Sequence, residues 1–165
     1  MVSLAAGGII QVDSEAQDSS RSGLTKYDPT RVHLIWGGIP LSQGIVKGTF
    51  ITVARNVKTW RLEHGIDGES ERVRSDDQSG VVSLTLMAGS RMNSVMSSIA
   101  TADELTGIFA TALYLQDFSG HSIHSSAFAY IESIPDKAYD VVPIPVRWDL
   151  ICRRLLTAPG GSRPA

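Results

Sequence analysis

Two histidines are the best candidates for metal ligands in this sequence, because His121 and His124 form an H-x-x-H pair. Zinc sites of this kind need both imidazoles on one face, together with a carboxylate or thiolate. On a strand, residues three apart point to opposite faces. No carboxylate follows at metalloprotease spacing, and Cys152 is the only thiol. We therefore interpret both histidines as structural residues beside a turn, and we predict no metal site.

The sequence also lacks the common catalytic and phosphate-binding motifs. Glycine pairs such as Gly37-Gly38 are not followed by Lys-Ser/Thr at phosphate-loop spacing, and no G-x-S-x-G motif occurs. Asp76 and Asp77 could form an acidic pair, but adjacent acidic residues before Gly80 are typical of an exposed turn. Cys152 alternates with apolar residues, which indicates a small buried side chain rather than a nucleophile. We predict that the protein is not an enzyme and binds no cofactor.

The overall charge argues against tight nucleic-acid binding. Lys and Arg number 15 against 17 Asp and Glu, which gives a formal net charge of −2. Proteins that grip nucleic acid normally carry a basic excess that neutralises phosphates. No apolar run approaches the ~18 residues that a membrane-spanning helix needs. A near-neutral chain of this kind is compatible with a channel through which DNA passes without sticking.

The elements that would position these residues are mostly strands. Val32, Leu34 and Trp36 alternate on one face before Gly37-Gly38, and the β-branched stretch from Ile45 to Arg55 has strand composition. Further alternating segments contain Trp60 and Leu62; Val82, Leu84 and Leu86; and Val146, Trp148, Leu150 and Cys152. Frequent glycine and proline favour short strands over long helices. The pattern predicts a mainly β fold.

One helix is expected after Ser90, which can cap it; the apolar stripe that follows is Met92, Val95, Met96 and Ile99. Thr101 to Glu104 resembles a capping box for a second helix with its own stripe, Leu105, Ile108, Phe109 and Ala112. Gly107 argues against that helix, because an interior glycine costs about 1 kcal/mol. Residues 108–117 fit a strand equally well, so periodicity alone leaves them undecided.

Composition divides the chain into three parts. Residues 1–30 are rich in Gly, Ser, Asp and Gln and are expected to form an N-terminal arm. Residues 31–156 are expected to form the packed domain, and residues 157–165 a flexible C-terminal tail.

A densely charged hairpin is predicted around the turn Gly65–Gly68. Its charged residues are Arg61, Glu63, Asp67, Glu69, Glu71, Arg72, Arg74, Asp76 and Asp77. Such a hairpin cannot bury much of itself in its own domain. Two interpretations stay open at this point: an exposed surface loop, or an arm that docks on a neighbouring subunit through complementary charges.

The succession of turns from Arg55 to Asn93 resembles the family of small phage tail tube proteins of contractile-tailed phages. In that family a strand leads to a G-x-D-G-E turn, a charged return strand, a D-x-S-G turn, an apolar strand and a helix opening near S-x-x-N. The matching positions here are Gly65, Asp67, Gly68, Glu69, Asp77, Ser79, Gly80, Leu84, Leu86, Ser90 and Asn93. Residues 39–56, Asp117–Gly120, residues 127–132, Pro135 and Arg147-Trp148 also fit.

The resemblance covers residues 31–155 and implies a β-sandwich or barrel-like tail tube fold with one flanking α-helix and a long protruding β-hairpin. It implies hexameric rings that stack into a tube for DNA delivery. The implied partners are further copies of the chain, the tail sheath, baseplate, tail terminator and tape measure proteins, and DNA that passes through the lumen without specific binding. The implied location is the phage tail, assembled in the host cytoplasm. The resemblance also favours a strand for residues 108–117.

Two departures from the family pattern are the long polar N-terminal segment and Lys47, where a neutral or acidic residue is expected. On the strand after Gly80, Ser83 and Thr85 alternate with the apolar positions, so we hypothesise that they face the lumen. The alternative functions are a tail terminator or baseplate adaptor, a secretion-type or bacteriocin tube protein of the same fold, and a small β-barrel enzyme or ligand-binding domain.

Overall fold

The computed structural model describes residues 27–161. The predicted N-terminal arm therefore lies largely outside the described residues, apart from its last four. Of these, Asp28 caps a short 3-10 helix, η1 (Pro29–Arg31), by accepting a hydrogen bond from the Thr30 N–H. Asp28 also joins this segment to the domain, because its N–H lies 3.3 Å from Ser119 Oγ.

The protein is mainly β, as predicted, with one antiparallel sheet of eight strands in the order β2-β1-β7-β8-β9-β6-β3 and with β10 also paired to β8. The strands are β1 (Val32–Trp36), β2 (Ile39–Pro40), β3 (Ile51–Arg55), β6 (Gly80–Leu86), β7 (Thr111–Asp117), β8 (Ile123–Ile131), β9 (Val146–Cys152) and β10 (Leu156–Ala158). A separate two-stranded sheet joins β4 (Trp60–His64) to β5 (Ser70–Arg74).

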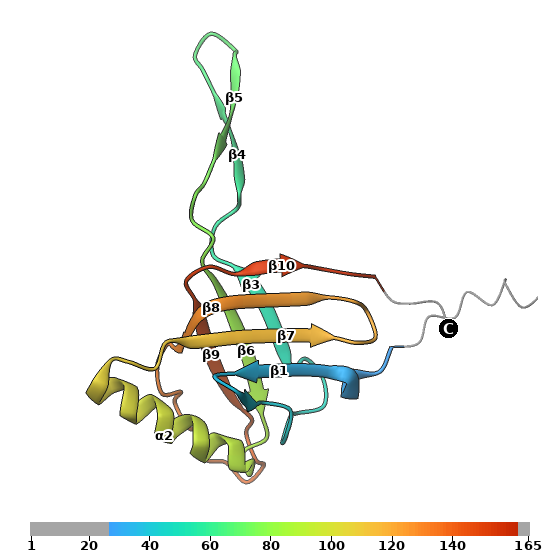
Figure 1. Cartoon of the computed structure of the whole chain (residues 1–165), viewed down its shortest axis with the longest axis vertical. Helices are drawn as coiled ribbons and strands as arrows, with labels where there is room; N and C mark the ends of the chain where they lie inside the picture. Colours follow the sequence, from blue (N-terminus) through green and yellow to red (C-terminus); the bar gives the residue numbers. More distant parts are fainter. Residues whose placement is uncertain (1–26, 162–165) are drawn as a thin grey trace, which may run out of the picture.

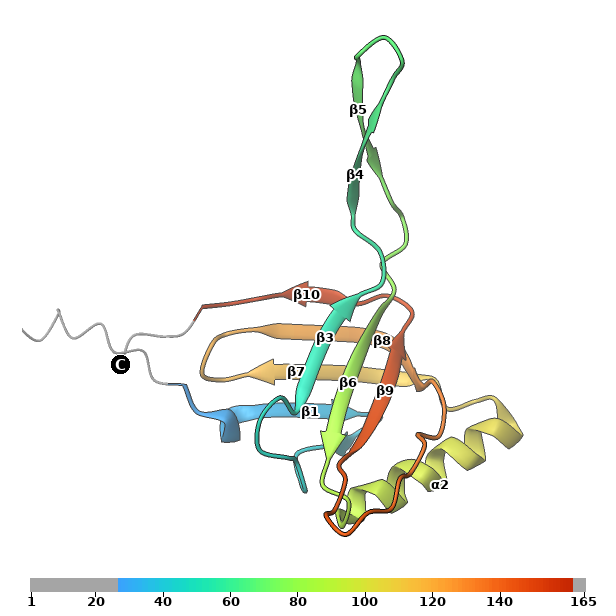
Figure 2. The same ribbon diagram turned by 180° about the vertical axis from the view of Figure 1, so that it is seen from behind.

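The eight-stranded sheet folds over on itself at β8. One edge of β8 pairs with β7, whereas the other edge is shared between β10 at residues 123–125 and β9 at Ala129–Ile131. The pairing register with β7 shifts between Thr111 and Leu113. Figures 1 and 2 show the result: β1, β7, β8 and β10 form one layer, and β3, β6 and β9 cross behind it. This is the expected sandwich-like arrangement.

The core lies between these two layers and is built from the alternating positions. Leu34, Trp36, Val82, Leu84, Leu86, Trp148 and Leu150 all have at most 2% of their surface exposed. Cys152 is also buried, as predicted. The indole of Trp36 donates to the Ala129 carbonyl at 2.9 Å, which satisfies its polar atom inside an apolar interior.

Within residues 27–161 one α-helix, α2 (Arg91–Thr106), flanks the sandwich. Ser90 caps it by accepting the Met92 N–H, as predicted. The possible capping box at Thr101–Glu104 does not begin a second helix, because these residues continue α2 without interruption to Thr106. Gly107 ends the helix with φ +66°, a left-handed conformation that glycine adopts without steric cost.

The structure also decides the two strand predictions that were open or imprecise, for residues 108–117 and 45–55. Residues 108–117 supply strand β7, as the family resemblance favoured. The strand predicted from Ile45 to Arg55 is shorter than expected: Ile45 forms only an isolated bridge with Leu86, and β3 begins at Ile51. Gly48, with φ +112°, interrupts the extended chain between them.

The paired part of the chain reaches further at its C-terminal end than the predicted boundary after residue 156. Thr157 and Ala158 lie in β10 opposite His124 and Ile123. Beyond the strand, the Gly160 N–H donates to Ser122 Oγ at 3.0 Å. Only three residues of β10 pair with β8, and a segment this short has no clear strand pattern in the sequence. The Gly- and Pro-rich composition of residues 158–165 therefore led to the prediction of a flexible tail.

Candidate assembly surfaces

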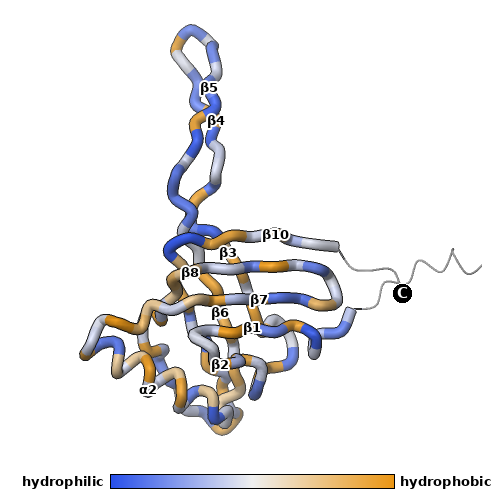
Figure 3. The backbone as a smooth tube through the Cα atoms, viewed as in Figure 1, coloured by the Kyte–Doolittle hydropathy of each residue, from blue (hydrophilic) through white to orange (hydrophobic). Residues whose placement is uncertain are grey.

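The hairpin β4–β5 projects from the top of the sandwich as a separate two-stranded sheet, unpaired with the other described strands (Figure 1). Its base is closed by a hydrogen bond of 2.9 Å from the Ser75 N–H to the Thr59 carbonyl. Its turn is closed by the Gly65 N–H, which donates to the Glu69 carbonyl at 2.7 Å, and Gly68 has φ +85°. All five residues of β4 are exposed. Figure 3 shows a largely hydrophilic arm with a few hydrophobic positions.

The hairpin has two chemically different faces, because directly paired residues share a face. On one face Leu62 pairs with Arg72 and Trp60 with Arg74. The guanidinium of Arg72 lies 3.7 Å from the centre of the Trp60 ring, a cation–π arrangement. This face therefore combines exposed apolar area with positive charge, since Trp60 and Leu62 are 45% and 60% exposed.

The other face is mainly acidic. Glu63 lies directly opposite Glu71, and Arg61 lies opposite Val73. Like charges placed opposite each other on a sheet are destabilising. Arg61 relieves part of the repulsion through an exposed ion pair of 2.7 Å with Glu63. An exposed pair of this kind contributes little on its own, so a basic partner would stabilise this face further.

The predicted hairpin residues divide into two groups. Seven lie on the arm itself: Arg61, Glu63, Asp67, Glu69, Glu71, Arg72 and Arg74. Asp76 and Asp77 lie at its base, near Arg153 and Arg154. There the Asp77 carboxylate accepts the Ser79 N–H at 2.8 Å, and this hydrogen bond lowers the pKa of Asp77. Asp77 thus also shapes the turn that leads into β6.

The sequence analysis did not predict that apolar residues would be exposed on these candidate surfaces. Trp60, Leu62 and Ile66 on the hairpin are exposed, and Ile66 at the tip most of all. A second exposed apolar group, Tyr139, Val141 and Val142, lies in the segment between β8 and β9. Trp60 and Leu62 alternate with polar residues as core residues of a strand do. The only sequence signal of their exposure is the large number of charged residues around them.

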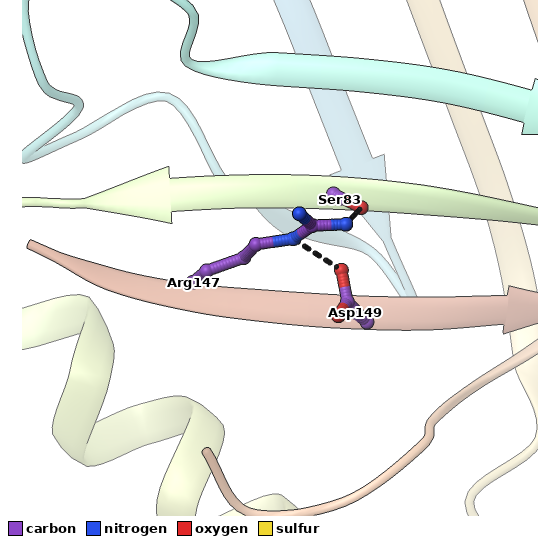
Figure 4. A network of polar contacts seen from close by, with 3 residues as sticks. All are labelled: Ser83, Arg147 and Asp149. Carbon is purple, nitrogen blue, oxygen red and sulfur yellow. Dashed lines mark hydrogen bonds and ion pairs between the residues drawn. The ribbon is translucent and has the colours of Figure 1, made fainter. Parts of the chain in front are cut away.

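The predicted channel residues lie on the face of β6 that points away from the core. Thr85 is half-buried, whereas only 6% of Ser83 is exposed. Ser83 is covered because Arg147 Nη2 donates to its Oγ at 2.8 Å (Figure 4). Arg147 also forms an ion pair of 2.9 Å with Asp149. The pair places opposite charges side by side, so this part of the face is close to neutral.

The titratable side chains of the described residues show no metal-binding arrangement. Residues 27–161 contain no group of three or more His, Cys, Asp and Glu side chains that could hold a metal. Burial lowers the pKa of His124 and raises the pKa of the Cys152 thiol. A raised pKa keeps the thiol protonated and weakly nucleophilic. None of the helices in that range is long and apolar enough to cross a membrane.

No protein-family model matches this sequence, and no curated protein sequence matches it. Solved structures do match the fold. The terminating cap of the anti-feeding prophage tube aligns over 83% of this chain and 93% of its own, with TM-score 0.55 and 11% identity. A sheath/tube terminator structure of the extracellular contractile injection system PVC aligns over 82% and 98%, with TM-score 0.58 and 10% identity.

A third match comes from the PVC sheath–tube complex in its extended state. It aligns over 87% of this chain and 97% of its own, with TM-score 0.53 and 9% identity. At these identities the likeness shows a shared fold. The fold is thus one that occurs in the tube and terminator assemblies of contractile injection systems, and it spans almost the whole of each matched chain.

Proposed function

We propose that this protein is a non-enzymatic structural subunit of the tube assembly of a contractile tail or injection device. The observation that carries the proposal is the likeness of fold over more than 80% of the chain to components of such assemblies. The exposed hairpin supports the proposal independently. Its apolar side chains Trp60 and Leu62 are exposed in the single chain, as expected for a surface that a neighbouring subunit covers.

We further propose that the subunit terminates the tube. Two of the structures described above are named for a cap or terminator, and they align with TM-scores of 0.55 and 0.58. In this role a homomeric ring closes the end of the tube. The ring would be hexameric, by analogy with the family that the sequence resembles. It would contact the tube on one side and sheath or further terminator proteins on the other. The particle, a phage tail or a phage-like injection system, would be its location.

A second candidate function is the tube subunit itself, and one observation favours it. Apolar surface is exposed at both ends of the long axis: Trp60 and Leu62 on the hairpin, and Tyr139, Val141 and Val142 in the segment before β9. In Figure 2 the segment before β9 runs along the end opposite the hairpin. A subunit inside a continuous stack has both ends covered, whereas a terminator covers one of them with a different protein.

Electron microscopy of the purified full-length chain separates the two roles. A terminator is expected to form rings of one size that do not elongate and that cap separately prepared tubes. A tube subunit is expected to form tubes whose length increases with concentration. Sedimentation that shows only monomers over a wide concentration range at low salt would refute both.

The hairpin is proposed to make the contacts between rings. Its alternating charges suit a patterned partner surface, and contacts between exposed charges weaken as salt screens them. Replacing Asp67-Gly68-Glu69 by a two-residue turn removes the tip while the base remains closed. Stacking or capping is then expected to fail in rings that otherwise form normally.

The face of β6 that carries Ser83 and Thr85 is proposed to line the channel. A wall without a basic excess does not hold phosphates, so DNA or another polyanion can slide past it. The double variant Thr85→Lys, Asp149→Asn leaves Arg147 unpaired and adds one cation. Assembled particles of this variant are expected to retain a DNA oligonucleotide at low salt, whereas wild-type particles release it. Equal retention would show that this face does not line the channel.

A further inference from the structure

The end of the sandwich where β1 begins and β7 ends is hollow. The apolar side chains of Val32, Phe50, Ile51, Val53 and Leu115 line part of this hollow of ≈ 500 Å³, which we call the mouth, and its polar lining includes Thr49, Asp117 and His124. An adjoining hollow of ≈ 750 Å³ shares Val32 and Phe50 and adds Lys47 at its rim. The β3 edge strand leaves the two layers unsealed here, so apolar side chains that face inward remain partly open to solvent.

His124 marks the mouth as incomplete in the single chain. It lies opposite the buried Leu115, so its side chain points between the layers. Its Nδ1 atom is buried and has no hydrogen-bond partner among the residues that the structure describes. A buried polar atom without a partner is costly, so this end of the domain is less well satisfied than the core between the layers.

The opposite end of the molecule presents a protrusion that we call the knob, formed by Leu105 and Ile108 where α2 ends. These two side chains are 84% and 73% exposed. Strand β7 begins three residues after Ile108 and ends at Asp117, which also lines the mouth. Seven residues of strand span about 20 Å. The knob and the mouth therefore lie at opposite ends of the molecule along β7, as Figures 1 and 2 both show.

One exposed charge at the knob is opposite in sign to one beside the mouth: Glu104 and Lys47. Glu104 lies in the last turn of α2, where a negative charge is unfavourable beside the exposed carbonyls of the helix terminus. No ion pair of Glu104 or of Lys47 is found within residues 27–161, and both side chains are exposed. Bringing Glu104 beside the Lys47 of another copy would stabilise both.

We propose that the knob of one copy inserts into the mouth of the next copy, with Glu104 beside the neighbour's Lys47. The inference rests on the proposed ring-forming function and names the contact within the ring. Because the two surfaces are different, the contact is heterologous, and a heterologous contact forms a ring when its repeated rotation closes. The hairpin projects roughly perpendicular to β7 in both views. It would therefore not interfere with contacts within the ring, and it would point toward the neighbouring ring or terminator.

Substitutions at exposed positions test the contact without disturbing the fold. Leu105→Asp is expected to raise the concentration needed for association at least about tenfold, because it removes an apolar side chain from a buried contact. Glu104→Lys and Lys47→Glu should each weaken association, and the double variant should restore it. Leu156→Asp, at a residue 51% exposed and outside the hairpin, the mouth and the knob, is the matched control and should still form rings.

A mixing experiment tests the heterologous geometry directly. A chain with Leu105→Asp keeps an intact mouth, whereas a chain with Lys47→Glu and Thr49→Glu keeps an intact knob. Neither is expected to associate alone, and a mixture should give a discrete 1:1 dimer by sedimentation velocity. Heterodimers support the proposal, and their absence in a mixture of folded chains overturns it.

Other outcomes also overturn the proposal and can be distinguished from failure of the proposed function. A Leu105→Asp chain that forms rings like the wild type refutes the contact while leaving the ring-forming function intact. If mouth variants change association only when residues 1–26 are present, the mouth accommodates the N-terminal segment of the same chain instead. A wild-type chain that never associates refutes the ring-forming function itself.

Discussion

At the scale of single residues, Trp148 and Trp60 are identical side chains in opposite surroundings. Trp148 is 1% exposed and its indole donates to Asn93 at 3.0 Å, which ties β9 to α2. Trp60 is 45% exposed on the hairpin. Trp148→Ala is expected to lower the free energy of unfolding by about 3–5 kcal/mol, because it opens a cavity in the core.

The matched control is Trp60→Ala, which should change the unfolding free energy of the monomer by less than about 0.5 kcal/mol. Urea denaturation followed by circular dichroism measures both. Equal losses for the two variants would mean that the hairpin is packed against the domain.

His124 gives the protein an expected sensitivity to acid. Burial lowers the pKa of His124 below its usual value of 6.5, so the folded state binds this proton less readily than the unfolded state. Stability then rises with pH through this range, and it falls as the pH drops below 6.5. Asp117 lines the same hollow, but its carboxylate already accepts the Ser119 N–H.

The measurement is the unfolding free energy as a function of pH for His124→Leu. This variant should lose less stability than the wild type between about pH 7 and 5, because it has no imidazole to protonate. His64→Gln, on the exposed hairpin, is the control and should leave the pH dependence as it is. A wild-type slope in the His124→Leu chain would contradict the prediction.

At the scale of elements, Gly107 determines where α2 stops. Its left-handed φ of +66° lets the chain leave the helix toward β7, and its N–H donates to the Asp103 carbonyl at 2.7 Å. Gly107→Ala is expected to cost about 1–2 kcal/mol, because a Cβ atom is strained in this conformation. Gly89→Ala is the control, since Gly89 lacks a positive φ and a Cβ there meets no atom within 4 Å. Chemical denaturation compares the unfolding free energies of the two variants. An unchanged unfolding free energy for Gly107→Ala would contradict the role of Gly107 as the C-cap of α2.

At the scale of the whole molecule, the hairpin is expected to be dispensable for folding and required for assembly. Thr59 and Ser75 already form a hydrogen-bonded pair at its base, so Asn-Gly can replace residues 60–74 as a two-residue hairpin loop. The unfolding free energy of the shortened chain should stay within about 1 kcal/mol of the wild type, because no residue of the arm belongs to the core.

Assembly of the shortened chain is expected to stop at single rings under conditions in which the wild type stacks or caps tubes. Negative-stain microscopy at low and high salt makes the comparison. Normal stacks of the shortened chain would show that the hairpin does not join rings.

The sequence by itself determined the elements whose signals are local. Alternation in segments such as Val82–Leu86 and Val146–Cys152 predicted strands with one buried face, and Ser90 predicted the start of the helix, since caps and periodicity act within a few residues. The protruding hairpin was also predictable, because a run of charges cannot be buried.

Only the tertiary structure decided the features that depend on distant partners. The fold of the sheet at β8 depends on which strands share its edge, and β10 is a strand only because β8 offers a free edge beside it. The sequence predicts an exposed polar side chain at Ser83, but in the structure Arg147, 64 residues away, covers it. The mouth and the knob likewise arise where two layers fail to close and where a helix ends, and these placements follow from long-range packing that no local pattern encodes.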